Sequence, residues 1–223
     1  LNMKPQHIAN IIWSAGTLRL DGVEAESMLT ALFSVAQEKA SNMLPQAIAS
    51  IIWAAGLLRL DSNDVSGPVA TLCSEAALKL DRFEPQGLAN MCCGLAMLGV
   101  RNDSLITGVA DRVVQAAGTW KGRDLSYALP QVVWALARLG FTSKTLLASV
   151  ADVLASSPSY LDKLKDWNLC ALVWSYVTLD TDREFADFRR SLVAKATQRG
   201  LNAQAVSRSR LGPQDWAVSE DSV

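Results

Sequence analysis

Apolar residues near the start of the chain recur at helical spacing, and a polar cluster separates them from a second amphipathic stretch. We expect the first helix to begin at Pro5, where the missing N–H of proline costs nothing. Asp21 and Glu24 have the spacing of a capping box that begins the second helix. The pattern therefore predicts a helix hairpin. Its expected apolar faces are Ile8, Ile11, Ile12, Ala15 and Leu18, then Met28, Leu29, Leu32, Phe33 and Ala36.

The same phrase occurs three times at an interval of 40 residues. It reads PQHIANIIWSAGTLRLD from Pro5, PQAIASIIWAAGLLRLD from Pro45 and PQGLANMCCGLAMLGV from Pro85. A repeat of this length is typical of a solenoid, in which each unit buries its apolar face only by stacking on its neighbours. We therefore expect function to lie along a repeated surface.

Weaker copies extend the repeat to five units. The tryptophan position of the phrase is occupied by Trp13, Trp53, Cys93, Trp134 and Trp174. The expected units are 5–44, 45–84, 85–125, 126–165 and 166–205, forming one domain over 1–205. Residues 206–223 are a tail or a truncated further repeat, in which Pro213-Gln214-Asp215-Trp216 resembles a sixth start.

Composition agrees with stacked helices. Half of the residues are hydrophobic and 19% are charged, but no apolar run reaches the roughly 18 residues that cross a membrane. No segment alternates with period two for long enough to form a strand. We predict a soluble all-α protein, an α-solenoid of about five helix hairpins, with a superhelix of either hand.

Two kinds of residue interrupt the pattern inside the first helix of a repeat. Gly16 and Gly56 each cost up to about 1 kcal/mol relative to alanine, which close packing against a bulky neighbour would offset. Pro130 stands where other repeats have alanine, so we expect the first helix of the fourth repeat to be kinked or to start late. Polar clusters such as Asn102-Asp103-Ser104 and Thr142-Ser143 are expected to cap the second helices, as are Asp61-Ser62-Asn63-Asp64 and Asp180-Thr181-Asp182.

The sequence offers little for catalysis, so we expect no enzyme, no metal and no cofactor in this segment. His7 is the one histidine, which excludes a site built from two. Four cysteines without CxxC spacing indicate buried free thiols: Cys73, Cys92, Cys93 and Cys170. The tryptophan position is flanked by aliphatic residues, so we expect Trp13, Trp53, Trp134 and Trp174 to be mostly buried.

A polar stripe on the first helix of each repeat is the candidate site. In the first repeat it comprises Gln6, Asn10, Ser14 and Thr17, opposite the isoleucines. Its second position varies among Asn10, Ser50, Asn90, Gln131 and Ala171, while the surrounding residues change little. One variable polar residue per repeat on a constant frame is how some helical-repeat proteins read single-stranded RNA. An ordinary solvent-facing side is the alternative.

Other residues extend this candidate RNA-binding set. Gln46 and Gln86 repeat Gln6, whereas Tyr127 and Trp167 place aromatic rings at the same position in the fourth and fifth units. Arg19, Arg59 and Arg138 lie near the ends of their helices, where they would contact phosphates or stabilise helix C-termini.

The pattern PQxxANxxWxxxxL, followed by a short connection and a second amphipathic helix, resembles the octotricopeptide repeat. It is also similar to the leucine-rich helical repeats of FAST-kinase-like and RAP-domain proteins. The match covers about nine tenths of the chain; it is strong in repeats one to three, partial in the fourth and weak in the fifth. The resemblance implies an α-solenoid that binds organellar RNA and controls its processing, stability or translation. A nuclease-like RAP domain, which such families often carry, would lie beyond Val223.

Two hypotheses of different class follow. The first is a module that binds single-stranded RNA in the mitochondrial matrix, or second in the chloroplast stroma, an expectation that rests on the resemblance alone. The second is a protein-interaction scaffold of the HEAT or armadillo type within an organellar ribonucleoprotein, which the near-zero net charge favours. A basic groove on the first helices would support RNA, and an apolar or acidic one would support protein.

Overall fold

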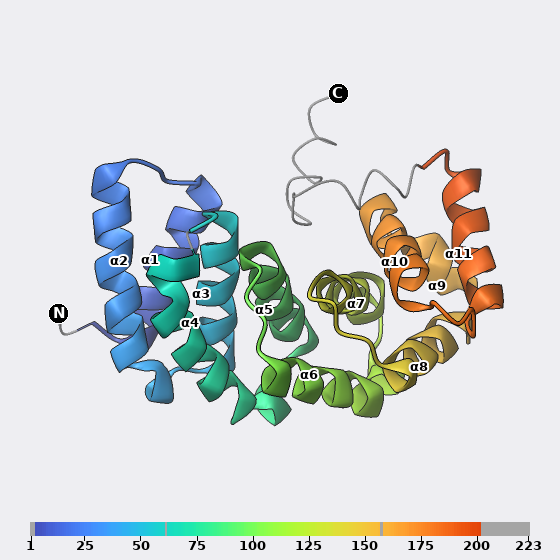
Figure 1. The fold of residues 1–223 in the computed structure, drawn as a ribbon, viewed down its shortest axis with the longest axis horizontal. Helices are drawn as coiled ribbons and strands as arrows, with labels where there is room; N and C mark the ends of the chain where they lie inside the picture. The colour runs from blue at the N-terminus through green and yellow to red at the C-terminus, as the bar shows by residue number, and fades with distance from the viewer. Residues whose placement is uncertain (1–2, 61, 157, 202–223) are drawn as a thin grey trace. The chain divides into compact units, whose positions relative to one another are not determined.

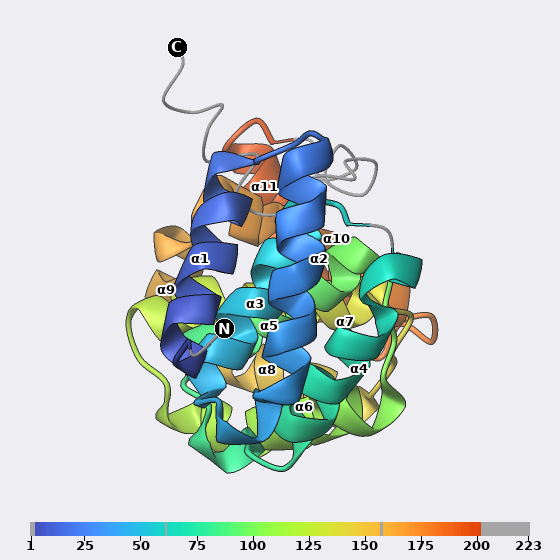
Figure 2. The same cartoon turned by 90° about the vertical axis from the view of Figure 1, so that its left-hand side faces the viewer.

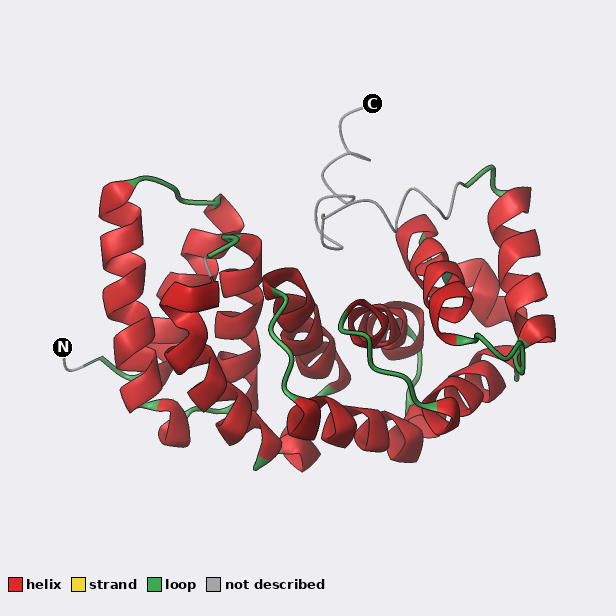
Figure 3. Cartoon of the chain, in the orientation of Figure 1, coloured by secondary structure: helices red, strands yellow, loops and turns green. Residues whose placement is uncertain are grey.

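The structure is a computed structural model that describes residues 3–60, 62–156 and 158–201. Every regular element among these residues is helical (Figure 3), as the sequence predicts. No helix in the described residues is long and apolar enough to span a membrane. The chain divides into two compact units, Leu1–Val109 and Ala110–Val223, with one helix crossing the boundary.

The first unit contains the three clearest repeats. Pro5, Pro45 and Pro85 each begin a helix, as the 40-residue interval predicts. Helices α1, α3 and α5 pack successively on one another, and α2 packs on α4 beside them (Figure 1). The elements are α1 Pro5–Leu18, α2 Val23–Glu38, η1 Ala40–Asn42, α3 Pro45–Leu57, α4 Ser62–Ala77, η2 Leu80–Arg82, α5 Pro85–Leu98 and α6 Asp103–Ala116.

The second unit contains the irregular repeats and one helix that the sequence did not predict, α9. Within it, α7 packs on α10, α10 packs on α11, and α9 packs on α8. The elements are η3 Ala117–Thr119, η4 Asp124–Ala128, α7 Leu129–Arg138, α8 Lys144–Ala155, α9 Pro158–Lys163, α10 Asp166–Leu179 and α11 Ala186–Gln198.

Pro130 delays the start of the first helix in the fourth repeat, which was one of the two expected outcomes. Residues Asp124–Ala128 form a turn of π-helix, and α7 begins only at Leu129, so that Pro130 falls in its first turn. The carbonyl oxygen of Ser126, four residues before Pro130, receives no N–H from the proline and instead accepts a hydrogen bond from Asn168 Nδ2 at 2.8 Å. The register of the fourth repeat is thus kept by a π-turn in place of one α-helical turn.

Small residues let the first helices of the repeats approach closely. A methyl group built on Gly16 lies 2.8 Å from Cβ of Ala54, and one on Gly56 lies 2.9 Å from the carbonyl oxygen of Gly94. At Gly16 the neighbour is the small residue Ala54, and not the bulky side chain that the sequence analysis expected, whereas at Gly56 the bulky side chain of Met97 lies at 2.9 Å beside the Gly94 backbone. Close contact between backbones offsets the low helix propensity of glycine.

The caps agree only in part with the sequence. Asn102 accepts a hydrogen bond from the Leu105 amide at 2.9 Å, and Ser143 accepts one from Leu146 at 3.2 Å. The predicted capping box at Asp21 is wrong: Gly22, with φ of 97°, is the cap residue of α2 and gives no side-chain cap. The side chains of 61–64 and the resemblance at Pro213-Gln214-Asp215-Trp216 lie outside the described residues.

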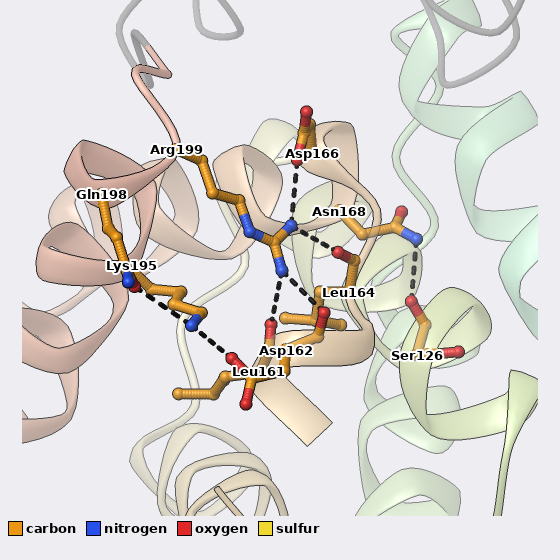
Figure 4. A network of polar contacts seen from close by, with 9 residues as sticks. All are labelled: Ser126, Leu161, Asp162, Leu164, Asp166, Asn168, Lys195, Gln198 and Arg199. Atoms are coloured by element: carbon orange, nitrogen blue, oxygen red, sulfur yellow. Dashed lines mark hydrogen bonds and ion pairs between the residues drawn. The ribbon is translucent and has the colours of Figure 1, made fainter. Parts of the chain in front are cut away.

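In each unit, one basic residue that follows a second helix donates hydrogen bonds to backbone carbonyls. These carbonyls belong to the connection that comes before the first helix of the same repeat. Lys79 Nζ donates hydrogen bonds to the carbonyl oxygens of Ala40, Ser41 and Met43 at 3.4, 2.8 and 3.1 Å. Arg199 does the same in the second unit (Figure 4). Its partners are the carbonyls of Leu161, Asp162 and Leu164, at 3.1, 2.8 and 2.6 Å, and the Asp166 carboxylate at 2.9 Å.

Candidate functional site

A groove of about 520 Å³ lies in the first unit along the N-terminal halves of α1, α3 and α5. It brings together six of the eight candidate residues that the sequence analysis selected in these three repeats, all except Arg19 and Arg59. We call it the amide groove, because five of the residues that line it carry a side-chain amide. Its lining is Gln6, Asn10, Trp13, Gln46, Ala49, Ser50, Glu84, Gln86, Gly87 and Asn90.

The helix starts explain this convergence. Each proline fixes the first turn of its helix, so the glutamine that follows occupies the same position in every repeat. The residue four places later lies on the same helix face, which aligns Asn10, Ser50 and Asn90 behind the glutamines. Because α1, α3 and α5 pack successively, the three pairs line one groove.

Hydrogen bonds to the preceding glutamines orient both asparagines among these three equivalent residues. Gln6 Nε2 donates to Asn10 Oδ1 at 2.9 Å, and Gln86 Nε2 donates to Asn90 Oδ1 at 2.8 Å. Such i,i+4 amide pairs are stabilised by the helix geometry. Each paired asparagine retains its amide hydrogens, and each glutamine retains its carbonyl oxygen, for a ligand. The middle repeat has a hydroxyl, on Ser50, in place of the second amide.

Trp13 is a groove residue that the sequence analysis placed in the core. Its side chain is 45% exposed and lines the amide groove, so the expected burial is wrong at this position. The spacing of Gln6, Asn10 and Trp13 is i, i+4, i+7, which is one helical face. The sequence analysis placed Ser14, and not Trp13, in the polar stripe. The i, i+7 spacing from Gln6 was the signal that could have identified Trp13.

The other tryptophans are more buried. Trp53 is 9% exposed and Trp134 is 2% exposed, and Trp174 is also mostly covered, as predicted. The buried indole nitrogens of Trp53 and Trp134 have no hydrogen-bond partner among the described residues. Packing therefore accounts for the burial of these two rings.

Charge in the amide groove is low and acidic. Among the described residues, Glu84 is the one charged residue of its lining, and no lysine or arginine lines it. Arg19 and Arg59 come nine residues after Asn10 and Ser50, which places them about 14 Å further along their helices. Both arginines have left-handed backbone, with φ of 50° and 51°, at the helix C-termini. They do not line the groove.

The candidate residues of the second unit have different surroundings. Gln131 is 1% exposed and Trp167 is also buried, so neither presents an open edge as the sequence analysis expected. The Trp167 ring packs edge-on against Trp134, with centroids 5.5 Å apart. Tyr127 is half-buried under the Arg123 guanidinium, 5.0 Å from its ring centroid. Only Arg138, in the last turn of α7, is exposed.

The described residues hold no group of three side chains that could bind a metal ion. All four cysteines are buried. Burial raises the pKa of the Cys73 and Cys92 thiols to about 12 and that of Cys170 to about 11, and it raises the pKa of Cys93 as well. These thiols are neutral at physiological pH and poor nucleophiles.

Comparison with known proteins adds no family. No protein-family model matches the chain, and no curated protein is similar to it.

Proposed function

We propose that the amide groove binds single-stranded RNA by contacting the edges of its bases. The observation that carries this proposal is that Asn10, Ser50 and Asn90, equivalent residues of three repeats, line one groove beside three equivalent glutamines. Side-chain amides and hydroxyls supply both donors and acceptors, which is what base edges require. Single-stranded RNA exposes these edges, whereas the major groove of duplex RNA does not admit side chains.

Trp13 gives the groove a surface for stacking. Its ring is half-exposed in the same lining as the amides. Stacking of a base on an aromatic ring is worth about 1–3 kcal/mol and tolerates every base. We propose that Trp13 stacks on one base while the amides discriminate between bases.

Because the groove carries little charge, we propose that its interior holds the bases and not the phosphates. A phosphate next to Glu84 would be repelled, and no cation of the lining would neutralise it. RNA bound in this way directs its phosphates to solvent. Binding is then modest in affinity and depends less on salt than binding through lysine and arginine.

The wider proposal follows the resemblance to octotricopeptide repeats. The all-α architecture and the successive packing of α1, α3 and α5 support a solenoid of helix hairpins. On this basis the chain is an RNA-binding segment of an organellar protein, mitochondrial or chloroplast, that acts in RNA processing, stability or translation. We propose no catalysis and no cofactor for it.

The test is a titration of RNA against a groove variant and a surface control. Asn10→Ala, Ser50→Ala and Asn90→Ala together should weaken binding of single-stranded RNA at least about tenfold, because three base contacts are lost. The matched control replaces Thr30, Ser34 and Ser74, exposed residues of α2 and α4, by alanine and should bind as wild type does. Duplex RNA should bind more weakly than single-stranded RNA to every chain.

Either of two results would reject the proposal: no RNA bound at low salt, or equal binding by the groove variant and the control. Circular dichroism of both triple variants separates lost contacts from lost fold, because all six positions are helical.

The acidic charge of the groove favours a second candidate, binding of an extended peptide. Asparagine and glutamine amides also pair with a peptide backbone, and a basic side chain would match Glu84 and the exposed face of Trp13. A set of arginine-containing peptides in the same titration distinguishes the two. Peptide binding that the groove variant loses, without RNA binding, would establish the scaffold function.

A further inference from the structure

The outward face of α1, on the side away from α3, differs from the same face of later first helices. Ile11 is 40% exposed and Leu18 is 71% exposed, although the sequence pattern assigned both to the core. Figure 2 views the first unit from this end, with α1 and α2 in front. His7, Ile11, Ser14 and Leu18 make up this face, which we call the α1 end face, and all four are exposed.

At the equivalent positions of α3 the side chains are covered by α1. Ala47, Ile51 and Ala54 lie 40 residues after His7, Ile11 and Ser14, and all three are buried. The contact is close, because a methyl group on Gly16 would lie 2.8 Å from Cβ of Ala54.

The contact between α3 and α5 repeats this arrangement. Met91 and Gly94 of α5 are buried, and Gly56 of α3 faces Gly94. Helices α1 and α3 each thus place a glycine against the small residue that stands at the Ser14 position of the next first helix. Ser14 itself is the first residue of that series, and it is exposed.

We propose that the α1 end face docks one further helix pair of this repeat type, in the register that α1 has on α3. The occupant places a glycine or alanine against Ser14 and buries Ile11. A second copy docked through α10, its last first helix, is a poor occupant, because it has Val177 where α1 has Gly16. The inference does not depend on RNA binding by the amide groove.

The test joins a second copy of residues 45–84 directly ahead of Pro5, in place of residues 1–4. This junction, Glu84 followed by Pro5, reproduces the natural Glu84–Pro85 connection. Ser14→Cys reports docking through the rate at which the introduced thiol is labelled. The native thiols contribute little background because they are buried. We expect labelling to be at least about 100-fold slower in the extended chain, since the site then reacts only on local unfolding.

Ser34→Cys is the matched control. Ser34 is exposed, and Ser74, its equivalent on α4, remains exposed with α2 packed beside it. The thiol introduced by Ser34→Cys should therefore label at the same rate with and without the added pair. Denaturant unfolding of the extended chain should show one transition with a larger m value, because the added pair unfolds together with α1.

Three results would overturn the proposal. The Ser14→Cys thiol labels equally fast in both chains; the added pair unfolds in a separate transition at lower denaturant; or the Ser14→Cys thiol of the original chain becomes protected as concentration rises, which identifies a second copy as the occupant. If the extended chain does not fold, a copy of residues 5–44 replaces the insert, with Gly16 in the role of Gly56. Failure of both inserts to fold on the chain also rejects the proposal.

Discussion

The tryptophan position shows how one repeated residue acquires different roles from its neighbours. Trp13 is half-exposed in the amide groove, Trp53 is almost fully covered, and Cys93 is buried completely. All three lie in the equivalent turn of the first helix of successive repeats. The covering elements, and not the local sequence, therefore decide whether the ring is core or ligand surface.

Trp53→Ala and Trp13→Ala form a matched pair that tests this difference. Trp53→Ala should destabilise the protein by about 3–5 kcal/mol, the cost of a large-to-small change in a core. Trp13→Ala should cost under about 1 kcal/mol, in the range of surface substitutions, but should weaken RNA binding. Chemical denaturation and RNA titration measure the two effects. Equal stability losses would contradict the assignment of Trp13 to the groove.

Gly94 is a second residue whose role depends on a neighbouring helix. A methyl group built there lies 2.3 Å from the carbonyl oxygen of Ile52. We therefore expect Gly94→Ala to destabilise by about 1–3 kcal/mol, although alanine favours helix. At Gly118 nothing lies within 4 Å of the added methyl group, so Gly118→Ala serves as the control. A gain in thermal stability for Gly94→Ala would show that α3 and α5 are further apart.

At the scale of elements, the helix starts were predictable and several connections were not. The prolines at positions 5, 45 and 85 and the constant period fix where α1, α3 and α5 begin. The π-turn before α7 and the short helix α9 follow from local competition between turns, which the periodic pattern does not encode. The failed capping box has the same origin, because positive φ at Gly22 moves the cap one residue past Asp21.

The basic side chains that follow second helices are structural at this scale. Arg199→Ala should destabilise the second unit by about 2 kcal/mol, because three carbonyl oxygens and the Asp166 carboxylate lose a charged donor. Arg190, in an exposed ion pair with Asp187, is the control, and its replacement by alanine should leave stability unchanged. Thermal unfolding compares the two variants. Equal melting temperatures would mean that solvent replaces the bonds of Arg199.

For the whole molecule, the sequence predicted which residues share one surface in the first three repeats, but not the burial of the candidate residues in the last two. The period of 40 never slips in the first three units, so Gln6, Asn10 and their equivalents converge on one groove. Gln131 and Trp167 belong to repeats that lack the PQ start at its regular place, and they are buried. Their burial depends on packing partners far along the chain, which the pattern of one repeat does not contain.

The charge of the groove predicts an unusual response of binding to salt. Because no lysine or arginine lines the amide groove, few counterions are released when RNA binds. We expect the logarithm of the association constant to fall with the logarithm of salt concentration with a slope of about −1 or less in magnitude. A slope near −3 or steeper would instead indicate phosphate contacts outside the groove, and Arg19→Ala and Arg59→Ala would then locate them.

The central claim, that the second position of each repeat reads one base, is tested most directly by Ser50→Asn. This change gives the middle repeat the same glutamine–asparagine pair as the repeats on either side. Selection of bound sequences from a random single-stranded RNA pool compares the variant with wild type. The account predicts that base preference changes at one position only and becomes that of the two flanking positions. An unchanged preference at every position, or a pool that yields no bound RNA, would contradict it.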